Sequence, residues 1–214
     1  MRIIAAIDMD GVVYDFVGAV RGMLLEELAP QTIEKSGLLR HHYPDDYNWT
    51  KWGLGQTAFD HVESHAESVF NRGTFLPWAE QGLEILEDKG IQYFFLTSPW
   101  GNEGTVSWSA SMAGKRRWLD QTNFSHIEIV PATTKCPSVR PYDVLIDDSC
   151  KHIAEAFHGG AKAIKIMAPS TQCDQCEQCA DATRHPRLYD AVQEITRSWS
   201  PTNPGSSVIT TPTP

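Results

Sequence analysis

A short apolar run that ends in two aspartates constrains the fold of this chain more than any other feature. Residues 3–7 are all apolar and do not alternate with polar residues, a pattern typical of a central parallel strand that helices cover on both faces. Asp8 and Asp10 follow at once, and Gly11 permits a tight turn with close backbone approach to a ligand. Ligands bind at the carboxyl ends of such strands, so we expect a binding site here. An acidic surface turn is the alternative interpretation.

The spacing of Asp8 and Asp10 indicates chemistry. Two residues apart on an extended chain, their side chains can project toward the same side. Carboxylates so close repel each other unless something separates their roles. The usual solutions are a hard metal ion, a shared proton, or a division into a nucleophile and a proton shuttle.

A second strand, predicted over residues 91–96, ends in Thr97 and Ser98. Hydroxyl groups and turn amides at the carboxyl end of a strand can bind a phosphate through neutral donors. An ordinary polar turn before Pro99 is the alternative. The loop predicted over residues 99–111 is long enough to be functional.

A third pair of polar residues, Asp147 and Asp148, ends the strand predicted over residues 143–149. A buried strand rarely finishes in two aspartates without a cation to meet them. Further strands are predicted over residues 126–130 and 161–167.

These residues resemble the motifs of a known family. The sequence DMDGVVYDF, residues 8–16, resembles the first motif of haloacid dehalogenase superfamily phosphatases, in the form found in 5'(3')-deoxyribonucleotidases. Thr97-Ser98 and Asp147-Asp148 are similar to later motifs, in the required order, and the resemblance covers roughly residues 3–167. It implies a Rossmann-like three-layer α/β sandwich with a parallel sheet and a small helical cap inserted after the first strand.

The resemblance also implies a mechanism. Asp8 would attack the phosphorus atom of a phosphomonoester, while Asp10 would protonate the leaving alkoxide and then activate water. Mg²⁺ would be held by Asp8, the Asp10 carbonyl and either Asp147 or Asp148.

The same resemblance implies which residues bind the substrate and its phosphate group. Thr97, Ser98 and Lys135 would bind it, with Arg140 as the rival of Lys135. Lys115, in the pattern K-x-x-W, is similar to a substrate-binding lysine of the deoxyribonucleotidases. A surface lysine is the alternative for this position.

The implied substrate is a deoxyribonucleoside monophosphate, with Phe16 and either Trp49 or Trp52 stacking on the base. The alternative is that these aromatic residues form the core of the cap. Two rival functions stay open: hydrolysis of a sugar phosphate or another small monoester, and a non-catalytic metal-binding interaction protein.

The apolar periodicity divides the chain into a core over residues 1–16 and 79–199, a helical cap over residues 17–78 and a disordered tail over residues 200–214. Helices are predicted over residues 16–28, 57–70, 79–89, 112–121, 152–157 and 187–199.

Two groups of residues could bind zinc. Cys173, Cys176 and Cys179 have ligand spacing, and His185 could complete a structural site; reduced thiols or a disulfide are the alternatives. His61 and His65 share a helix face and could bind zinc if a third ligand approached. A solvated face or cap packing is the alternative for the two histidines.

Composition excludes some partners. The 214-residue chain has a net charge of −9 and no long run of lysine or arginine, so a long nucleic acid is not expected as a ligand. No leader-like segment and no window of 18 apolar residues is present, which predicts a cytoplasmic protein without a membrane partner. Five cysteines argue against a secreted disulfide framework. The oligomeric state stays open, a homodimer included.

Overall fold

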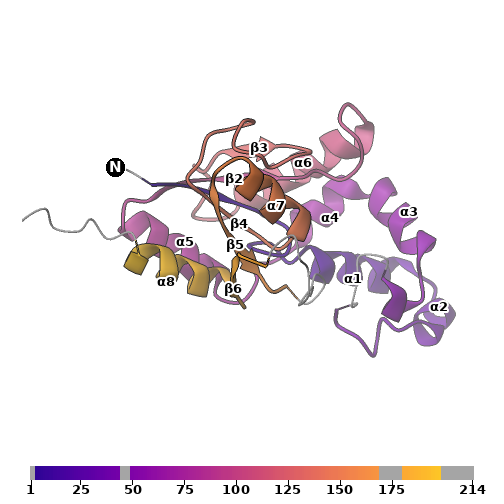
Figure 1. The fold of residues 1–214 in the computed structure, drawn as a ribbon. Coiled ribbons are helices and arrows are strands. Elements are labelled where there is room, and N and C mark those ends of the chain that lie inside the picture. The colour runs from indigo at the N-terminus through magenta and orange to yellow at the C-terminus, as the bar shows by residue number, and fades with distance from the viewer. Residues whose placement is uncertain (1–2, 44–48, 169–179, 199–214) are drawn as a thin grey trace, which may run out of the picture.

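A six-stranded parallel sheet forms the centre of the protein. The computed structural model describes residues 3–43, 49–168 and 180–198 (Figure 1). The strands are β1 (Ile4–Ile7), β2 (Gln92–Thr97), β3 (Ile129–Pro131), β4 (Val144–Asp147), β5 (Lys162–Ile166) and β6 (Thr183–His185). Their order is β3-β2-β1-β4-β5-β6, and every neighbouring pair is parallel. The direction of strand succession reverses beside β1, so the carboxyl end of β1 lies where ligands bind in such sheets.

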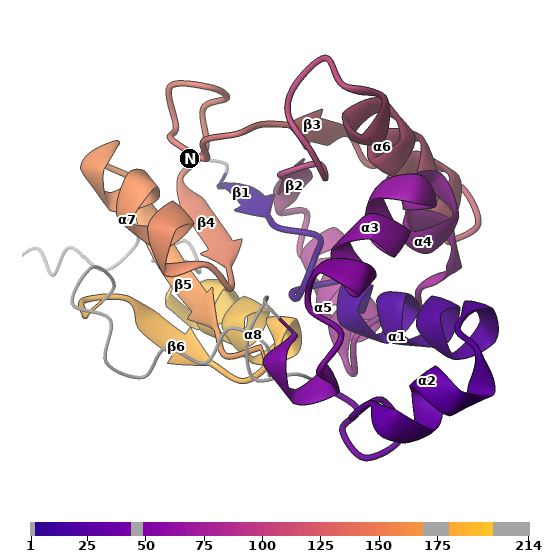
Figure 2. The same ribbon diagram turned by 90° about the vertical axis from the view of Figure 1, so that its right-hand side faces the viewer.

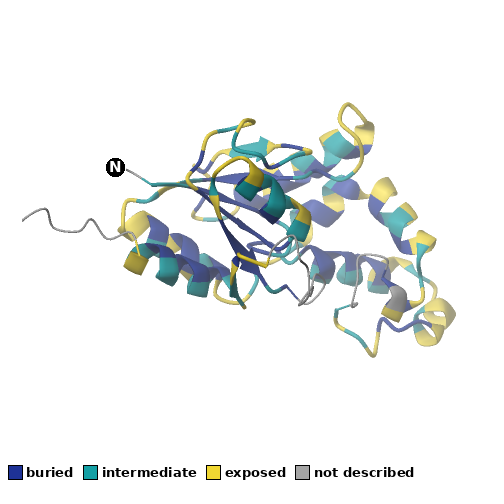
Figure 3. Cartoon of the chain, viewed as in Figure 1, coloured by how far each residue is buried: buried dark blue, intermediate teal, exposed yellow. Residues whose placement is uncertain are grey.

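Side chains of the central strands alternate between two apolar cores. Ala5 and Ile7 of β1 belong to one buried cluster, whereas Ala6 between them belongs to the other. Phe95 and Phe94 of β2 divide in the same way. Both faces of the sheet are therefore covered, as the predicted three-layer α/β sandwich requires, and the central strands β1, β2 and β4 are mostly dark blue in Figure 3.

The helices are arranged around this sheet. They are α1 (Phe16–Glu27), α2 (Pro30–Lys35), α3 (Gln56–Ser64), α4 (Ala66–Arg72), α5 (Ala79–Asp88), α6 (Val106–Leu119), α7 (Cys150–His158) and α8 (Leu188–Ser198), with a short 3₁₀ helix, η1, at Thr50–Trp52. Helices α5 and α8 pack together against one face, and α7 packs against β4 and β5 on the other. Helices α1–α4 lie together beside the sheet, with α6 against α4 (Figure 2). We name residues 17–78 the cap segment; its separation as a unit stays a prediction.

Local signals explain where α1 begins and ends, as predicted. The Asp15 side chain accepts a hydrogen bond from the Gly18 N–H group at 2.8 Å, which satisfies a donor in the first turn. At the other end, Leu28 is extended and Pro30 begins α2. The helix therefore leaves directly from the turn that contains Asp8 and Asp10.

Two helix predictions were wrong at their boundaries. The helix expected over residues 57–70 is broken at His65, whose backbone (φ −126°) separates α3 from α4. Helix α6 begins at Val106, well before residue 112, because the Thr105 hydroxyl accepts a hydrogen bond from the Trp108 N–H group at 3.3 Å. The long loop predicted over residues 99–111 is correspondingly shorter.

The edge strands also differ from prediction. Strand β3 covers Ile129–Pro131 instead of residues 126–130, and β6 was not predicted. The three residues of β6, Thr-Arg-His, carry no apolar signal because this edge strand is only partly buried. The predicted tail over residues 200–214 lies outside the described residues. No helix within the described ranges is long and apolar enough to cross a membrane.

Candidate active site

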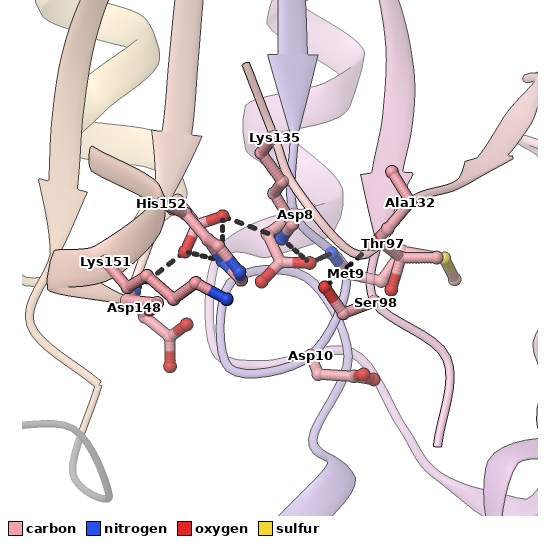
Figure 4. Close-up of polar contacts among 12 residues, drawn as sticks. Asp8, Met9, Asp10, Thr97, Ser98, Ala132, Lys135, Asp148, Lys151 and His152 are labelled. Atoms are coloured by element: carbon pink, nitrogen blue, oxygen red, sulfur yellow. Dashed lines mark hydrogen bonds and ion pairs between the residues drawn. The ribbon is translucent and has the colours of Figure 1, made fainter. Parts of the chain in front are cut away.

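The residues singled out at three strand ends converge at one edge of the sheet (Figure 4). Asp8 follows β1, Thr97 ends β2 and Asp147 ends β4. Because β2 and β4 flank β1 in parallel, their carboxyl ends meet beside Asp8. Sheet topology thus assembles residues that are far apart in the sequence.

Lys135 joins two of the carboxylates. It lies in the loop after β3, its side chain is fully buried, and its Nζ atom is 2.7 Å from Asp8 Oδ1 and 2.7 Å from Asp147 Oδ2. Arg140 instead forms two hydrogen bonds of 2.6 and 2.7 Å with Glu128. Of these two residues, Lys135 is therefore the cation that lies beside Asp8.

One lysine shared by two carboxylates leaves Asp8 incompletely compensated. Burial raises the pKa of Asp8 to about 6, against the charge of Lys135, and the Asp147 and Asp10 charges add to this effect. Burial acts in the same direction on Asp147, but Lys135 and His152 outweigh it and lower the pKa of Asp147 to about 2. A proton or a further cation beside Asp8 would offset this buried negative charge.

Asp8 has one oxygen available for chemistry. Its Oδ1 atom accepts the Met9 N–H group at 2.7 Å as well as the Lys135 ammonium group. No hydrogen bond from a described residue reaches Oδ2. The hydrogen bonds to Oδ1 orient the carboxylate and leave Oδ2 without a donor among the described residues.

Lys115 occupies an unexpected position. The alternative of a surface lysine is wrong, because its side chain is fully buried and its Nζ atom lies 2.5 Å from Asp10 Oδ2 and 2.6 Å from Thr97 Oγ1. The other oxygen, Asp10 Oδ1, is buried and has no hydrogen-bond partner among the described residues. A buried acceptor without a partner is costly, and a ligand that donates a hydrogen bond to Asp10 Oδ1 would remove that cost.

The predicted phosphate-binding hydroxyls lie at the same edge. Thr97 is fully buried and accepts the Lys115 hydrogen bond, while Ser98 Oγ donates to the Ala132 carbonyl at 3.0 Å. Both hydroxyls are thus held by the protein. Their contact with a phosphate stays a prediction.

The turn between Asp8 and α1 leaves no room for a side chain at Gly11. Gly11 has φ +77°, and a Cβ atom there would lie 2.3 Å from Asp148 Oδ2. The backbone of Asp148 is held in place by the buried Lys165, whose ammonium group donates to the Asp148 carbonyl oxygen at 2.6 Å. The absence of a side chain at position 11 allows the Asp148 carboxylate to approach the first motif.

Lys165 and His152 were not predicted as site residues. Lys165 is fully buried within β5, and a lysine inside an apolar strand is the signal that could have revealed it. His152 lies in the first turn of α7 with Nδ1 3.3 Å from Asp147. No local pattern distinguishes this histidine from a surface residue.

The residues present fit a magnesium ion. Carboxylate oxygens of Asp8 and Asp147 lie within 4.8 Å of each other, and the His152 ring beside them is not a ligand that Mg²⁺ prefers. Four carboxylates exceed three buried ammonium groups at this edge, and carboxylate oxygens are ligands that Mg²⁺ prefers. These groups are Asp8, Asp10, Asp147, Asp148, Lys115, Lys135 and Lys165.

The aromatic residues predicted to contact a base are mostly enclosed. Phe16 stacks on Phe70 with centroids 4.9 Å apart, and Trp49 and Trp52 are almost fully buried. Trp52 Nε1 donates to the His41 carbonyl at 3.0 Å, which supports the cap-core alternative for this residue. Trp49 Nε1 is buried without a partner among the described residues, and contact of Trp49 with a ligand stays a prediction.

The predicted cysteine zinc site is only partly visible. Cys173, Cys176 and Cys179 lie outside the described residues. His185 Nε2 lies 2.6 Å from Glu194 Oε2, so this ring is already engaged by a carboxylate. The site stays a prediction.

Several solved structures share this fold at low sequence identity. A HAD family hydrolase from Deinococcus radiodurans R1, with bound phosphate and sodium, aligns with a TM-score of 0.53 and 15% identity over 92% of this chain and 96% of its own. L-2-haloacid dehalogenase from Xanthobacter autotrophicus, with chloropropionic acid covalently bound, aligns with a TM-score of 0.51 and 13% identity over 94% of this chain and 100% of its own. A hydrolase from Pseudomonas syringae aligns with a TM-score of 0.53 and 17% identity over 94% of this chain and 100% of its own. The chain therefore has the HAD-like Rossmann-type α/β fold. No protein-family model and no curated protein sequence matches it.

Proposed function

We propose that this protein is a Mg²⁺-dependent phosphomonoesterase with Asp8 as the nucleophile and Asp10 as the general acid and base. The observation that carries the proposal is the Lys135 ammonium group, 2.7 Å from both Asp8 and Asp147, beside an Asp10 carboxylate that Lys115 anchors. A nucleophile, a separate proton donor and two buried cations at a sheet edge suit transfer of a phosphoryl group.

The reaction would proceed in two displacements. Asp8 Oδ2 attacks phosphorus, the bond from phosphorus to the ester oxygen breaks, and Asp10 Oδ1 gives its proton to the departing alkoxide. Water then attacks the aspartyl phosphate, Asp10 takes the proton of that water, and the Asp8 carboxylate leaves with the bond to phosphorus broken. Lys115 holds Asp10 Oδ2 during both steps, which keeps Oδ1 directed toward the reacting atoms.

The metal would complete the charge balance. Asp8, the Asp10 carbonyl and either Asp147 or Asp148 would hold Mg²⁺, which when bound neutralises phosphate oxygens. Lys135 would remain between Asp8 and Asp147, and Thr97 and Ser98 would orient the phosphate.

The direct test is phosphate release from a panel of nucleotides and sugar phosphates, with Mg²⁺ and with EDTA. We expect turnover only with Mg²⁺, and none in Asp8→Asn. Asp120→Asn, an exposed aspartate that pairs with Arg116 on the surface, is the matched control and should retain full activity. Full activity in chelator, or in Asp8→Asn, would refute the proposal.

For the substrate we propose a deoxyribonucleoside monophosphate. Aromatic residues of the cap segment and of the loop after β2 form a cluster that suits the binding of a flat base. The Trp49 and Phe59 rings stack with centroids 4.8 Å apart, and the Trp100 and Phe16 ring centroids are 5.8 Å apart. The buried Trp49 N–H group offers a donor to a polar base edge. The structural relatives do not distinguish this substrate from a sugar phosphate, which remains the rival.

The substrate proposal can be tested at Trp49. Trp49→Phe keeps a ring but removes the N–H donor, whereas Trp49→Ala removes the ring. Loss of one hydrogen bond should lower nucleotide kcat/KM by roughly 2- to 13-fold, and loss of stacking by roughly 5- to 150-fold. Glycerol phosphate hydrolysis should change little. Trp52→Phe, whose N–H bonds the His41 carbonyl, is the control for packing effects common to both substrates. Equal losses for both substrates in the Trp49 variants would favour the rival.

A further inference from the structure

Three ligand-forming side chains meet on the surface of the cap segment, away from the candidate active site. Glu27 ends α1, His61 lies in the last turn of α3, and His65 follows α3 directly. The Glu27 carboxylate oxygen Oε2 is 3.2 Å from His61 Nδ1 and 3.7 Å from His65 Nδ1. Ligand atoms of all three residues lie within 4.8 Å of one another.

The two separations that involve Glu27 are close to those of a tetrahedral metal site. With metal-to-ligand distances of about 2.0–2.1 Å, two ligand atoms of a tetrahedral zinc site lie about 3.3 Å apart. The two measured distances to Glu27 Oε2 lie on either side of this value. The His61 and His65 rings are nearly parallel, with planes 17° apart and centroids 6.1 Å apart.

Charge also favours a cation between these groups. Within the described residues, the ion-pair partners of Glu27 are the two imidazoles. His65 Nδ1 lies 3.1 Å from the His61 carbonyl oxygen as well, so an ion must displace the proton shared there. A metal ion that binds imidazole strongly offsets the free-energy cost of removing this proton.

We propose that Glu27, His61 and His65 form a zinc-binding site, with water as the fourth ligand. Two imidazole nitrogens and one carboxylate suit Zn²⁺, whereas Mg²⁺ and Ca²⁺ prefer oxygen ligands alone. No thiol is among the three residues, so the set does not select Cu⁺. The Zn²⁺ ion joins the end of α1 to the end of α3.

The site is separate from the proposed phosphatase chemistry. Glu27 lies at the opposite end of α1 from the Asp15 cap, about 18 Å along the helix. None of its three ligands is a residue assigned to the reaction. Zinc here stabilises the packing of the cap segment, and hydrolysis does not require it.

Zinc titration of the full-length chain tests the site. The parent carries Cys173→Ser, Cys176→Ser and Cys179→Ser, so that these thiols bind no zinc, and excess Mg²⁺ occupies the candidate active site. We expect about one equivalent of zinc by calorimetry, and a Tm increase of about 5 to 10 °C at a hundredfold excess over Kd. His61→Ala and His65→Gln should each weaken zinc binding by about a hundredfold and remove most of the Tm increase.

His126→Ala is the matched control, because His126 forms a similar surface pair with Glu87 (3.0 Å) but has no second imidazole. This variant should bind zinc like the parent. Phosphatase activity with Mg²⁺ should be the same in all the variants, which verifies that each is folded. Zinc binding that is absent in the parent, or unchanged in both His61→Ala and His65→Gln, would overturn the proposal.

Discussion

Lys115 is fully buried, and its ammonium group lies between Asp10 and Thr97 while resting 4.8 Å from the centroid of the Phe70 ring. A lysine is rarely buried without a charged partner, because desolvation of the ammonium ion is expensive. Asp10 supplies that partner, and in return the lysine holds one Asp10 oxygen in place. The pair links α6 to the first motif.

Lys115→Met should therefore lower kcat by about a hundredfold, since Asp10 loses the group that orients it for proton transfer. KM should change little. If Lys115 binds the substrate, as the family resemblance implies, KM should instead rise strongly. Steady-state kinetics on the substrate that the panel shows to be hydrolysed fastest distinguishes these two results. Lys89→Met, at an exposed lysine that follows α5, is the control.

Asp8→Asn should stabilise the metal-free protein while abolishing activity. The ionised Asp8 is buried and shares its lysine with Asp147, so a neutral amide removes an unfavourable charge. The rise of its pKa from 3.8 to about 6 corresponds to roughly 1–3 kcal/mol at pH 7. Urea unfolding in EDTA measures this gain, with Asp120→Asn as the control. A less stable Asp8→Asn protein would contradict the electrostatic account.

At the scale of elements, the turn between β1 and α1 positions both catalytic candidates and the start of the cap segment. Tyr14 ties this turn to α4, since its hydroxyl donates to the Val69 carbonyl at 2.6 Å and accepts the Gly73 N–H group at 2.9 Å. The turn also approaches β4 so closely that Gly11 meets the Asp148 carboxylate. Small backbone changes here should therefore affect the reaction more than overall stability.

Gly11→Ala tests this expectation against Gly90→Ala. Both glycines have positive φ, +77° and +63°, so both variants should lose about 1–2 kcal/mol from backbone strain. A Cβ atom at Gly90 meets nothing within 4 Å, whereas at Gly11 it displaces Asp148. Activity should fall at least about a hundredfold in Gly11→Ala alone. Equal activity in the two variants would show that the Asp148 position is unimportant.

For the whole molecule, the candidate site makes stability depend on pH and on Mg²⁺ together. Between about pH 4 and pH 6, Asp8 is protonated in the folded metal-free protein and ionised in the unfolded chain. The folded state binds the additional proton, so the Asp8 contribution to stability decreases as pH rises through this range. Asp147, with its pKa lowered to about 2, acts in the opposite sense but only below about pH 4.

Mg²⁺ should therefore raise Tm more at about pH 7.5 than at about pH 4.5, because the ion binds the ionised carboxylate. Thermal unfolding of wild type and Asp8→Asn, with and without Mg²⁺, measures the difference. The pH dependence of the Mg²⁺ effect should be much weaker in Asp8→Asn. An identical Mg²⁺ effect at both pH values in wild type would exclude Asp8 as the titrating ligand.

The sequence by itself determined the features that depend on neighbouring residues. An apolar run followed by Asp8 and Asp10 predicts a buried strand with carboxylates at its end, and the chain forms β1 there. The strand that ends in Asp147 follows the same rule, as does the start of α1 at Phe16. Periodicity and turn residues are local, so they can be read without coordinates.

Only the tertiary structure decided which distant residues meet. Lys115 reaches Asp10 across 105 positions of sequence, and Glu27 reaches His61 across 34. The order of strands and the packing of helices set these contacts, and no pattern near either partner encodes them. The edge strand β6 and the break at His65 were missed for the same reason, because neighbouring elements stabilise them more than their own residues do.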